Sequence, residues 1–183
     1  MHGQPPDARP IAFGTLFVVA QHLDRLGDVV LAPLGLTTKQ WLLLAVVQRG
    51  FAERRPTLTE TAAAYGSSRQ NVKAIARGLE AAGYLRIVPD PADRRASRLE
   101  LTDKVGVFAT PEWRAREVAF FSFAFDDLQL PEVAQLADLL QRWLAVVASR
   151  PAMAGTPVVQ PRSTSVVWSA PWVGASIPRP SAK

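Results

Sequence analysis

The sequence contains no cysteine, and only two of its 183 residues are histidine. The absence of cysteine excludes disulfide bonds, thiolate metal sites and redox sensing through a thiol. His2 and His22 are too few and too far apart to resemble a zinc signature. The strongly apolar stretch 41–47 is far too short to span a bilayer. We therefore expect a cytoplasmic protein without a membrane segment, a metal or a cofactor.

The signatures of common catalytic sites are also missing. The chain has no glycine-rich phosphate loop and no recognisable pairing of a nucleophile with a base. We therefore do not expect an enzyme.

Basic residues are concentrated in the middle third of the chain. The net charge is +5, but Arg162, Arg179 and Lys183 lie in a C-terminal stretch without any acid, so the remaining residues carry only 18 basic and 16 acidic groups. Between Arg49 and Lys104 there are 11 basic and 7 acidic residues. Such an excess in one segment favours a nucleic-acid partner.

The spacing of apolar and capping residues predicts a mainly helical chain. Apolar residues at intervals of three and four predict a helix over 11–32, and Thr37 or Thr38 can cap a second helix through Val47. Capping-box patterns at 57–60 and 67–70 predict a third helix to Tyr65 and a fourth to about Ala82. Residues 103–126 look helical with a restart at 110–111, and another helix follows from Pro131.

The third and fourth predicted helices have the spacing of a helix-turn-helix. Ala62 lets the helices approach, Gly66 permits the turn, and Val72 packs the second helix on the first. One face of the fourth helix holds cations and a glutamine but no acid, whereas a solvated helix usually mixes both signs. We therefore predict a DNA-binding face, made of Ser68, Arg69, Gln70, Asn71, Lys73 and Arg77.

Two short alternating runs, 84–88 and 98–102, predict a β-hairpin directly after this helix. Its turn-rich tip, 90–96, carries arginines that suit a narrow minor groove, where the negative potential is strongest. Asp93 is either a turn residue or a partner that aims Arg95. The DNA contacts predicted on the hairpin are Arg86, Asp93, Arg94, Arg95 and Arg98.

Several stretches resemble the multiple-antibiotic-resistance regulator (MarR) family of winged helix-turn-helix proteins. These stretches are 36–41, 58–62, 68–72, 79–84 and, most specifically, the Asp90-Pro91-Ala92-Asp93-Arg94-Arg95-Ala96 wing leading into 99–102. The resemblance covers roughly residues 11–149. It departs from the family pattern at Val105, where the glycine that usually closes the wing is displaced to Gly106.

The resemblance implies a triangular homodimer with a mainly α fold and a small β-hairpin wing. We divide the chain into an N-terminal extension (1–10), a dimerisation helix (11–36), the winged helix-turn-helix domain (37–104) and C-terminal dimerisation helices (105–149). Residues 150–183 hold six prolines after Arg150 and no acid, and we expect a flexible tail. Trp168 and Trp172 leave open a docking role for that tail.

The resemblance further implies a repressor that binds an inverted repeat in double-stranded DNA and is released by a small aromatic or amphipathic ligand. Such an effector could contact Phe13, Phe17, Trp41, Trp113 and Arg116, although packing in a core also explains the aromatic residues. The alternative is a winged helix that contacts protein or RNA without recognising an operator.

Overall fold

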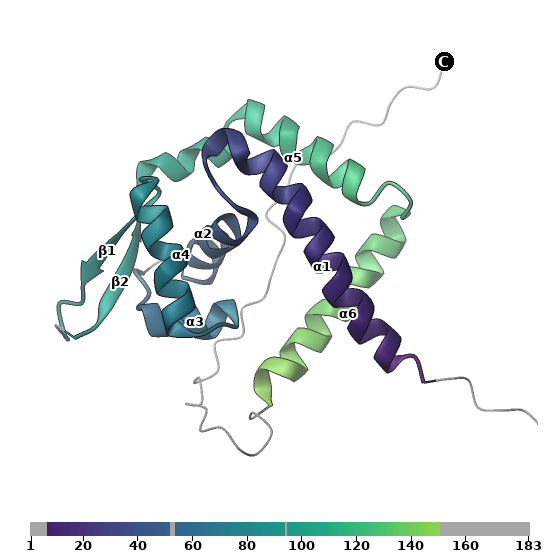
Figure 1. The fold of residues 1–183 in the computed structure, drawn as a ribbon, viewed down its shortest axis with the longest axis horizontal. Helices are drawn as coiled ribbons and strands as arrows, with labels where there is room; N and C mark the ends of the chain where they lie inside the picture. The colour runs from purple at the N-terminus through teal and green to yellow at the C-terminus, as the bar shows by residue number, and fades with distance from the viewer. Residues whose placement is uncertain (1–6, 52–53, 94, 151–183) are drawn as a thin grey trace, which may run out of the picture.

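The computed structural model describes residues 7–51, 54–93 and 95–150. The residues in these ranges form ten elements, which are arranged in two parts (Figure 1). One part is a winged helix-turn-helix, and the other consists of α1 (Arg9–Leu31), α5 (Pro111–Ala124) and α6 (Leu130–Ser149). The predicted fold class, mainly helical with one small hairpin, is confirmed.

The N-terminal helix connects the two parts. α1 exposes nearly its whole length and buries only Gly27 and Leu31, at its C-terminal end. A short 3-10 helix, η1 (Ala32–Leu34), follows and ends at Gly35, whose φ of 68° lies in the left-handed region that glycine adopts without strain. The chain then turns into the winged domain.

The centre of the winged domain is α2 (Thr38–Gly50). Thr37 caps it through a reciprocal bond with Gln40, and every residue from Leu43 to Val47 is buried. The predicted helix was too short by one turn at its C-terminal end. A helix buried over consecutive positions must be surrounded, and the two helices that follow, the second strand of the hairpin and α1 all pack against α2.

α3 (Leu58–Tyr65) and α4 (Arg69–Ala81) form the predicted helix-turn-helix. Thr57 and Glu60 make the expected capping box, and Gly66 turns the chain with a φ of 71°. At the start of α4 the prediction was wrong by one residue, because Ser68, and not Ser67, is the N-cap. Asn71 donates to Ser67 Oγ at 2.9 Å, so the second capping box does not form.

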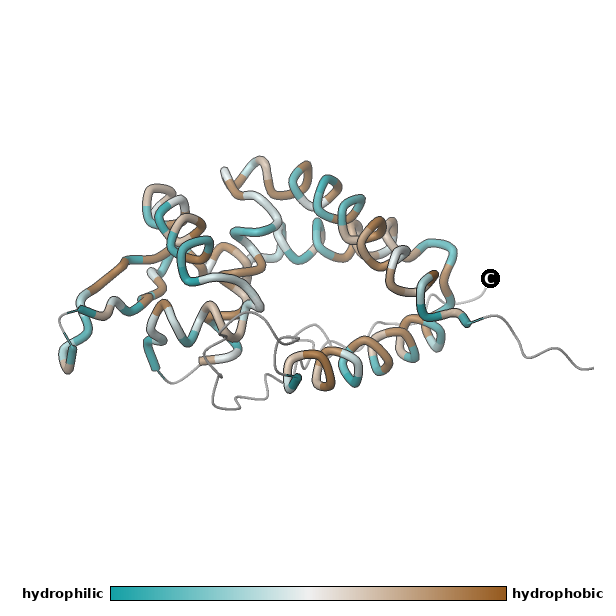
Figure 2. The backbone as a smooth tube through the Cα atoms, turned by 60° about the horizontal axis from the view of Figure 1, so that its bottom comes forward, coloured by the Kyte–Doolittle hydropathy of each residue, from teal (hydrophilic) through white to brown (hydrophobic). Residues whose placement is uncertain are grey.

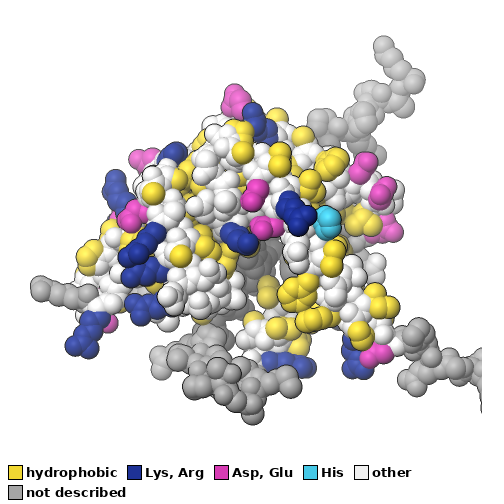
Figure 3. Space-filling model, viewed as in Figure 1, with side chains coloured by type: hydrophobic (Ala, Val, Ile, Leu, Met, Phe, Trp, Pro, Cys, Tyr) yellow, Lys and Arg dark blue, Asp and Glu magenta, His cyan; other side chains and the backbone are white. Residues whose placement is uncertain are grey.

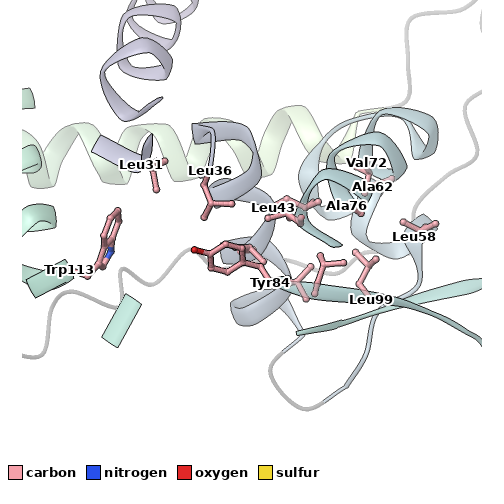
Figure 4. Packing of buried hydrophobic residues seen from close by; sticks show 14 residues of the cluster. Leu31, Leu36, Leu43, Leu58, Ala62, Val72, Ala76, Tyr84, Leu99 and Trp113 are labelled. Carbon is pink, nitrogen blue, oxygen red and sulfur yellow. The ribbon is translucent and has the colours of Figure 1, made fainter. Parts of the chain in front are cut away.

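The hairpin pairs β1 (Leu85–Pro89) with β2 (Ser97–Leu101) in antiparallel register, with Ile87 opposite Leu99. Both strands lie one residue from their predicted position. Leu85 and Leu99 are buried under the hairpin, where they join Val72 and Leu79 of α4 and Leu43 of α2 in one core (Figure 4). The side chains that give the hairpin its alternation are thus those that attach it to the helices.

The segment after the hairpin is not one continuous helix. Residues Asp103–Ala109 form a 3-10 helix, η2, and α5 begins at Pro111 with Thr110 as its N-cap. The predicted restart at 110–111 is confirmed, but the first half of 103–126 is 3-10 and not α-helical. Proline at the first helical position lacks only an N–H that would be unpaired in any case.

Within the described ranges, no single helix is long and apolar enough to cross a membrane. The pair Arg9–Leu34 and Thr38–Gly50 meets that measure only when taken together across an 80° bend.

Candidate nucleic-acid interface

The exposed face of α4 carries the predicted cluster of cations. Arg69, Gln70, Lys73 and Arg77 are all exposed, while Val72, Ala76 and Leu79 on the opposite side are buried. None of the ion pairs found among the described residues includes a cation of this face. Lys and Arg side chains gather over α4 and the hairpin in Figure 3. The face therefore presents uncompensated positive charge that suits phosphate.

Two residues that we predicted as DNA contacts are used to start the helix. The Ser68 side chain accepts the N–H of Asn71 at 3.2 Å, and the Asn71 side chain donates to Ser67. These bonds satisfy a backbone donor that would otherwise be free in the first turn. Both residues remain exposed at the end of the face, so they can still reach a phosphate through their remaining hydrogen-bonding groups.

The other end of α4 is attached to the hairpin by residues that sequence reasoning missed. Glu80 Oε1 accepts the N–H of Ile87 on β1 at 2.8 Å. Lys104 Nζ donates to the carbonyl of Ala82 at 2.7 Å and lies 4.4 Å from the centre of the Tyr84 ring. A lysine at a helix C-terminus satisfies a carbonyl and complements the helix dipole. Glu80 precedes the turn at Gly83 and Lys104 follows it, and these positions are the sequence signal by which the two residues could have been found.

The tip of the hairpin is held by local backbone bonds. Asp90 N donates to the carbonyl of Ala96 at 3.1 Å, and Ala96 N donates to the carbonyl of Asp93 at 2.9 Å. Asp93 Oδ1 accepts the backbone N–H of Arg95 at 2.9 Å. Asp93 is therefore a turn residue that bonds to the Arg95 backbone, rather than a partner of the Arg95 guanidinium among the described contacts. Arg95 itself is exposed, and Arg94 lies outside the described residues.

The two arginines on the arms of the hairpin differ. Arg86 is exposed and takes part in none of the ion pairs found in the described ranges. Arg98, in contrast, is already bound inside the protein: its guanidinium lies 2.7 Å from Asp90 Oδ2 and donates to the carbonyl of Arg55 at 2.7 Å. The structure thus separates Arg98 from the exposed cations with which the sequence grouped it.

The predicted effector residues are only partly brought together. Trp41 and Trp113 line a small apolar pocket of about 50 Å³ where α1, α2 and α5 meet; the other lining residues are Gly27, Val30, Leu31, Thr38, Glu117, Phe120 and Phe121. Phe13 and Phe17 contact each other on the exposed part of α1, and Arg116 is exposed on α5; none of these three lines the pocket. The pocket is too small for an aromatic acid unless the helices move apart.

Two polar groups at this pocket are poorly solvated. Trp113 is 6% exposed, and its indole N–H is the only buried side-chain polar atom without a hydrogen-bond partner in the described part of the chain. Burial raises the pKa of Glu117 to about 7, although the nearby positive charges of Arg49 and Arg114 oppose that rise. Burial also lowers the pKa of Arg49. For both Glu117 and Arg49, the cost of removing the charge from water outweighs the attraction between the two charges.

No group of three or more Asp, Glu or His side chains in the described ranges could hold a metal ion.

Comparisons with known proteins agree with this geometry. Residues 34–96 match the MarR family model. A curated relative, the transcriptional activatory protein BadR of Rhodopseudomonas palustris, is 33% identical over 108 residues, which are 56% of this chain and 61% of the relative. The matched region thus spans less than two thirds of that protein's length.

Solved structures share the fold at lower sequence identity. A MarR transcriptional regulator from Methanosarcina mazei matches with a TM-score of 0.64 at 14% identity, over 76% of this chain and 97% of that one. A mutant MarR from E. coli, crystallised with operator DNA, matches with a TM-score of 0.60 at 22% identity, over 77% of this chain and 99% of that one.

The fold and the exposed cationic helix define a winged helix-turn-helix protein. The resemblance to the MarR family of transcriptional regulators, which the sequence predicted, is confirmed.

Proposed function

We propose that the protein is a homodimeric regulator of transcription that recognises a specific sequence in double-stranded DNA. In this proposal α4 enters the major groove and the tip of the hairpin enters the adjacent minor groove. The observation that carries the proposal is the exposed face of α4, where Arg69, Lys73 and Arg77 carry no compensating acid. The E. coli MarR structure that shares this fold was crystallised with operator DNA.

The dimer in this proposal forms through α1, α5 and α6. None of the twenty residues of α6 is buried, although its sequence is strongly amphipathic. Leu136, Leu140 and Trp143 on its apolar stripe are all more than a third exposed. A second copy that covers this stripe would remove from water an apolar surface that monomers rarely expose. Two-fold symmetry then implies an inverted repeat with half-sites about 10 base pairs apart.

The two parts of the interface have different proposed roles. Gln70 and an arginine of α4 read base edges, while Lys73 mainly holds phosphate. Arg95 acts through groove shape and charge, because a minor groove attracts arginine without identifying each base pair. Arg86, exposed on β1, adds charge to the hairpin, while the predicted contact Arg94 lies outside the described residues.

Matched titrations on operator variants at several salt concentrations test this division of roles. The operator is first located by footprinting the protein on DNA that flanks its own gene. Arg95→Ala should weaken binding by about 1 to 3 kcal/mol and flatten the salt dependence, with base preference in the major groove unchanged. Gln70→Ala should change which bases are preferred and leave the salt dependence nearly as it was. Normal binding by Arg95→Ala at every salt concentration would refute the minor-groove assignment.

The alternative function, contact with protein or RNA through the same surface, predicts a different result. Binding would then show no preference for an inverted repeat over a scrambled duplex of the same length and composition.

Regulation by repression and release by a small ligand are further parts of the proposal. A bound dimer that overlaps a promoter represses, whereas BadR, the curated relative, is named an activatory protein. A reporter fused to the footprinted promoter, measured with and without the regulator, shows whether the protein represses or activates transcription.

A ligand at the pocket between α1, α2 and α5 would have to separate α5 from α2, since the existing volume is about 50 Å³. Such a movement would change the spacing of the two α4 helices in a dimer.

A further inference from the structure

The ion pair between Asp90 and Arg98 lies within the hairpin, and Arg98 also joins the hairpin to a segment 43 positions earlier in the chain. Arg98 is on β2, Asp90 begins the tip of the hairpin, and the carbonyl of Arg55 belongs to the segment before α3. We propose that this pair is a latch that fixes the tip of the wing to the helix-turn-helix, so that Arg98 is a positioning residue and not a DNA contact. This inference rests on the proposed function of the wing.

The first half of the latch is the guanidinium. One of its nitrogens lies 2.7 Å from Asp90 Oδ2, and the other donates to the carbonyl of Arg55 at 2.7 Å. The backbone of β2 bonds to the same segment: Leu99 N donates to the carbonyl of Pro56 at 2.8 Å, and Arg98 forms an isolated bridge with Thr57. β2 is therefore tied to the segment that leads directly into α3. Arginine suits this role because its planar fork makes two bonds in fixed directions.

The second half is the carboxylate. Asp90 is 5% exposed, and its Oδ1 accepts the N–H of Ala92 at 2.8 Å while its Oδ2 meets Arg98. The bond from Ala92 lowers the pKa of Asp90, and Arg98 lowers it further, against the effect of desolvation. The pair therefore stays ionised at neutral pH. A carboxylate so poorly exposed depends on its partner, because removing the partner leaves a charge without compensation.

The latch lies close enough to Arg95 to order the backbone that carries this residue. Only a few residues separate Asp90 from Arg95, and the backbone of Asp90 bonds to Ala96 on the other side of the tip. The side chain of Arg98 is only 28% exposed, so little of its guanidinium is left for phosphate. A tip that is already ordered loses less conformational entropy when it enters a groove. Loss of the latch should weaken binding through Arg95 without removing a phosphate contact.

Two measurements on Arg98→Ala separate a positioning role from a contact. In the free protein, hydrogen exchange at the amides of Asp90, Ala92 and Ala96 should become about tenfold faster. On operator DNA, affinity should fall about tenfold at each salt concentration, with the slope of affinity against salt equal to that of the wild type.

Asp90→Asn is a second test in case Arg98→Ala does not fold. This variant keeps an acceptor for Ala92 and should give smaller changes of the same kind. The double variant should be no weaker than the worse single variant, because both remove the same interaction.

Arg55→Ala is the matched control. It removes a neighbouring guanidinium that pairs with Glu100 at the surface, but it keeps the carbonyl to which Arg98 donates. Exchange at the three tip amides should stay at the wild-type rate. Unchanged exchange in Arg98→Ala, or a salt slope reduced by about one, would overturn the latch and make Arg98 a phosphate contact. If the wild-type protein binds no DNA, the proposed function fails, and the exchange rates still decide whether the pair holds the tip.

Discussion

Side chains of the same residue type have different surroundings in this protein, even within one hairpin or one helix. Arg95 and Arg98 are three positions apart in a basic hairpin, yet the first is exposed and the second binds Asp90 and a carbonyl. Glu117 and Glu112 lie on the same helix, yet the first borders an apolar pocket and the second is exposed. The environment of each group decides which charge is available.

The raised pKa of Glu117 predicts a stability that depends on pH. Well below pH 4.5 the carboxyl is protonated in both the folded and the unfolded chain. Between about pH 4.5 and 7 the unfolded chain ionises while the folded one keeps its proton, so the free energy of unfolding falls as the pH rises. Glu117→Gln removes this titration, and the variant should exceed the wild type at pH 8 by at most about 3 kcal/mol.

Urea unfolding at pH 4, 6 and 8, at one protein concentration, measures this difference. Glu112→Gln, in the exposed first turn of α5, is the control and should stay within about 0.5 kcal/mol of the wild type at each pH. A gap between wild type and Glu117→Gln that does not change with pH would contradict the assignment.

Among the elements, the joint between α1 and α2 fixes the winged domain to the N-terminal helix. Thr38 Oγ1 donates to the carbonyl of Asp24 at 2.8 Å, and Thr38 N donates to Asp28 Oδ1 at 2.6 Å. Gly27 lies against the same threonine, and a Cβ at this position would collide with Thr38 Oγ1. The two helices can approach this closely only because residue 27 has no side chain.

Gly27→Ala should therefore weaken this joint. We expect a loss of about 1 to 3 kcal/mol in the free energy of unfolding, since the added methyl must displace Thr38 and its bonds to α1. Gly14→Ala lies on the same helix with nothing within 4 Å of the added Cβ, and it should be neutral or stabilising by up to about 1 kcal/mol. Thermal and urea unfolding of the two variants provide the comparison. Equal stability of both variants would show that the joint can adjust without cost.

At the scale of the whole molecule, apolar surface is distributed unevenly. Apolar residues recur along the helices outside the winged domain (Figure 2), and many of them are exposed. The most exposed examples on α1 and α6 are Ile11, Val29 and Leu130. The winged domain, in contrast, buries its apolar residues in one core. The winged domain thus covers its apolar residues within one chain, whereas many apolar residues of α1 and α6 stay exposed.

We expect a mass of about twice 19.9 kDa by light scattering at micromolar concentration. Leu140→Glu, in the middle of the α6 stripe, should give a monomer, because a charge would be buried without a partner in the interface. Ala145→Glu, on the opposite side of the same helix, should leave the mass doubled. A monomeric wild-type protein, or an equal effect of both variants, would contradict dimerisation through this stripe.

Local sequence patterns were enough to predict the order and type of the elements in the winged domain. Local rules were sufficient there: Thr57 and Glu60 cap a helix within four residues, Gly66 provides the left-handed turn, and the apolar spacing of α4 selects its buried side. The same rules placed Arg69, Lys73 and Arg77 on one exposed face. These features depend on interactions only a few residues apart, so they can be predicted without the fold.

Contacts between elements that are distant in the sequence determine which of the candidate side chains are available to a ligand. Arg98 meets a carbonyl 43 positions away, and Trp41 shares a pocket with Trp113 from another helix, while Phe13 and Phe17 do not. No local pattern encodes such distances, because they follow from how the packed core orients each element. The role of a charged or aromatic residue here is therefore set by partners that only the folded chain brings together.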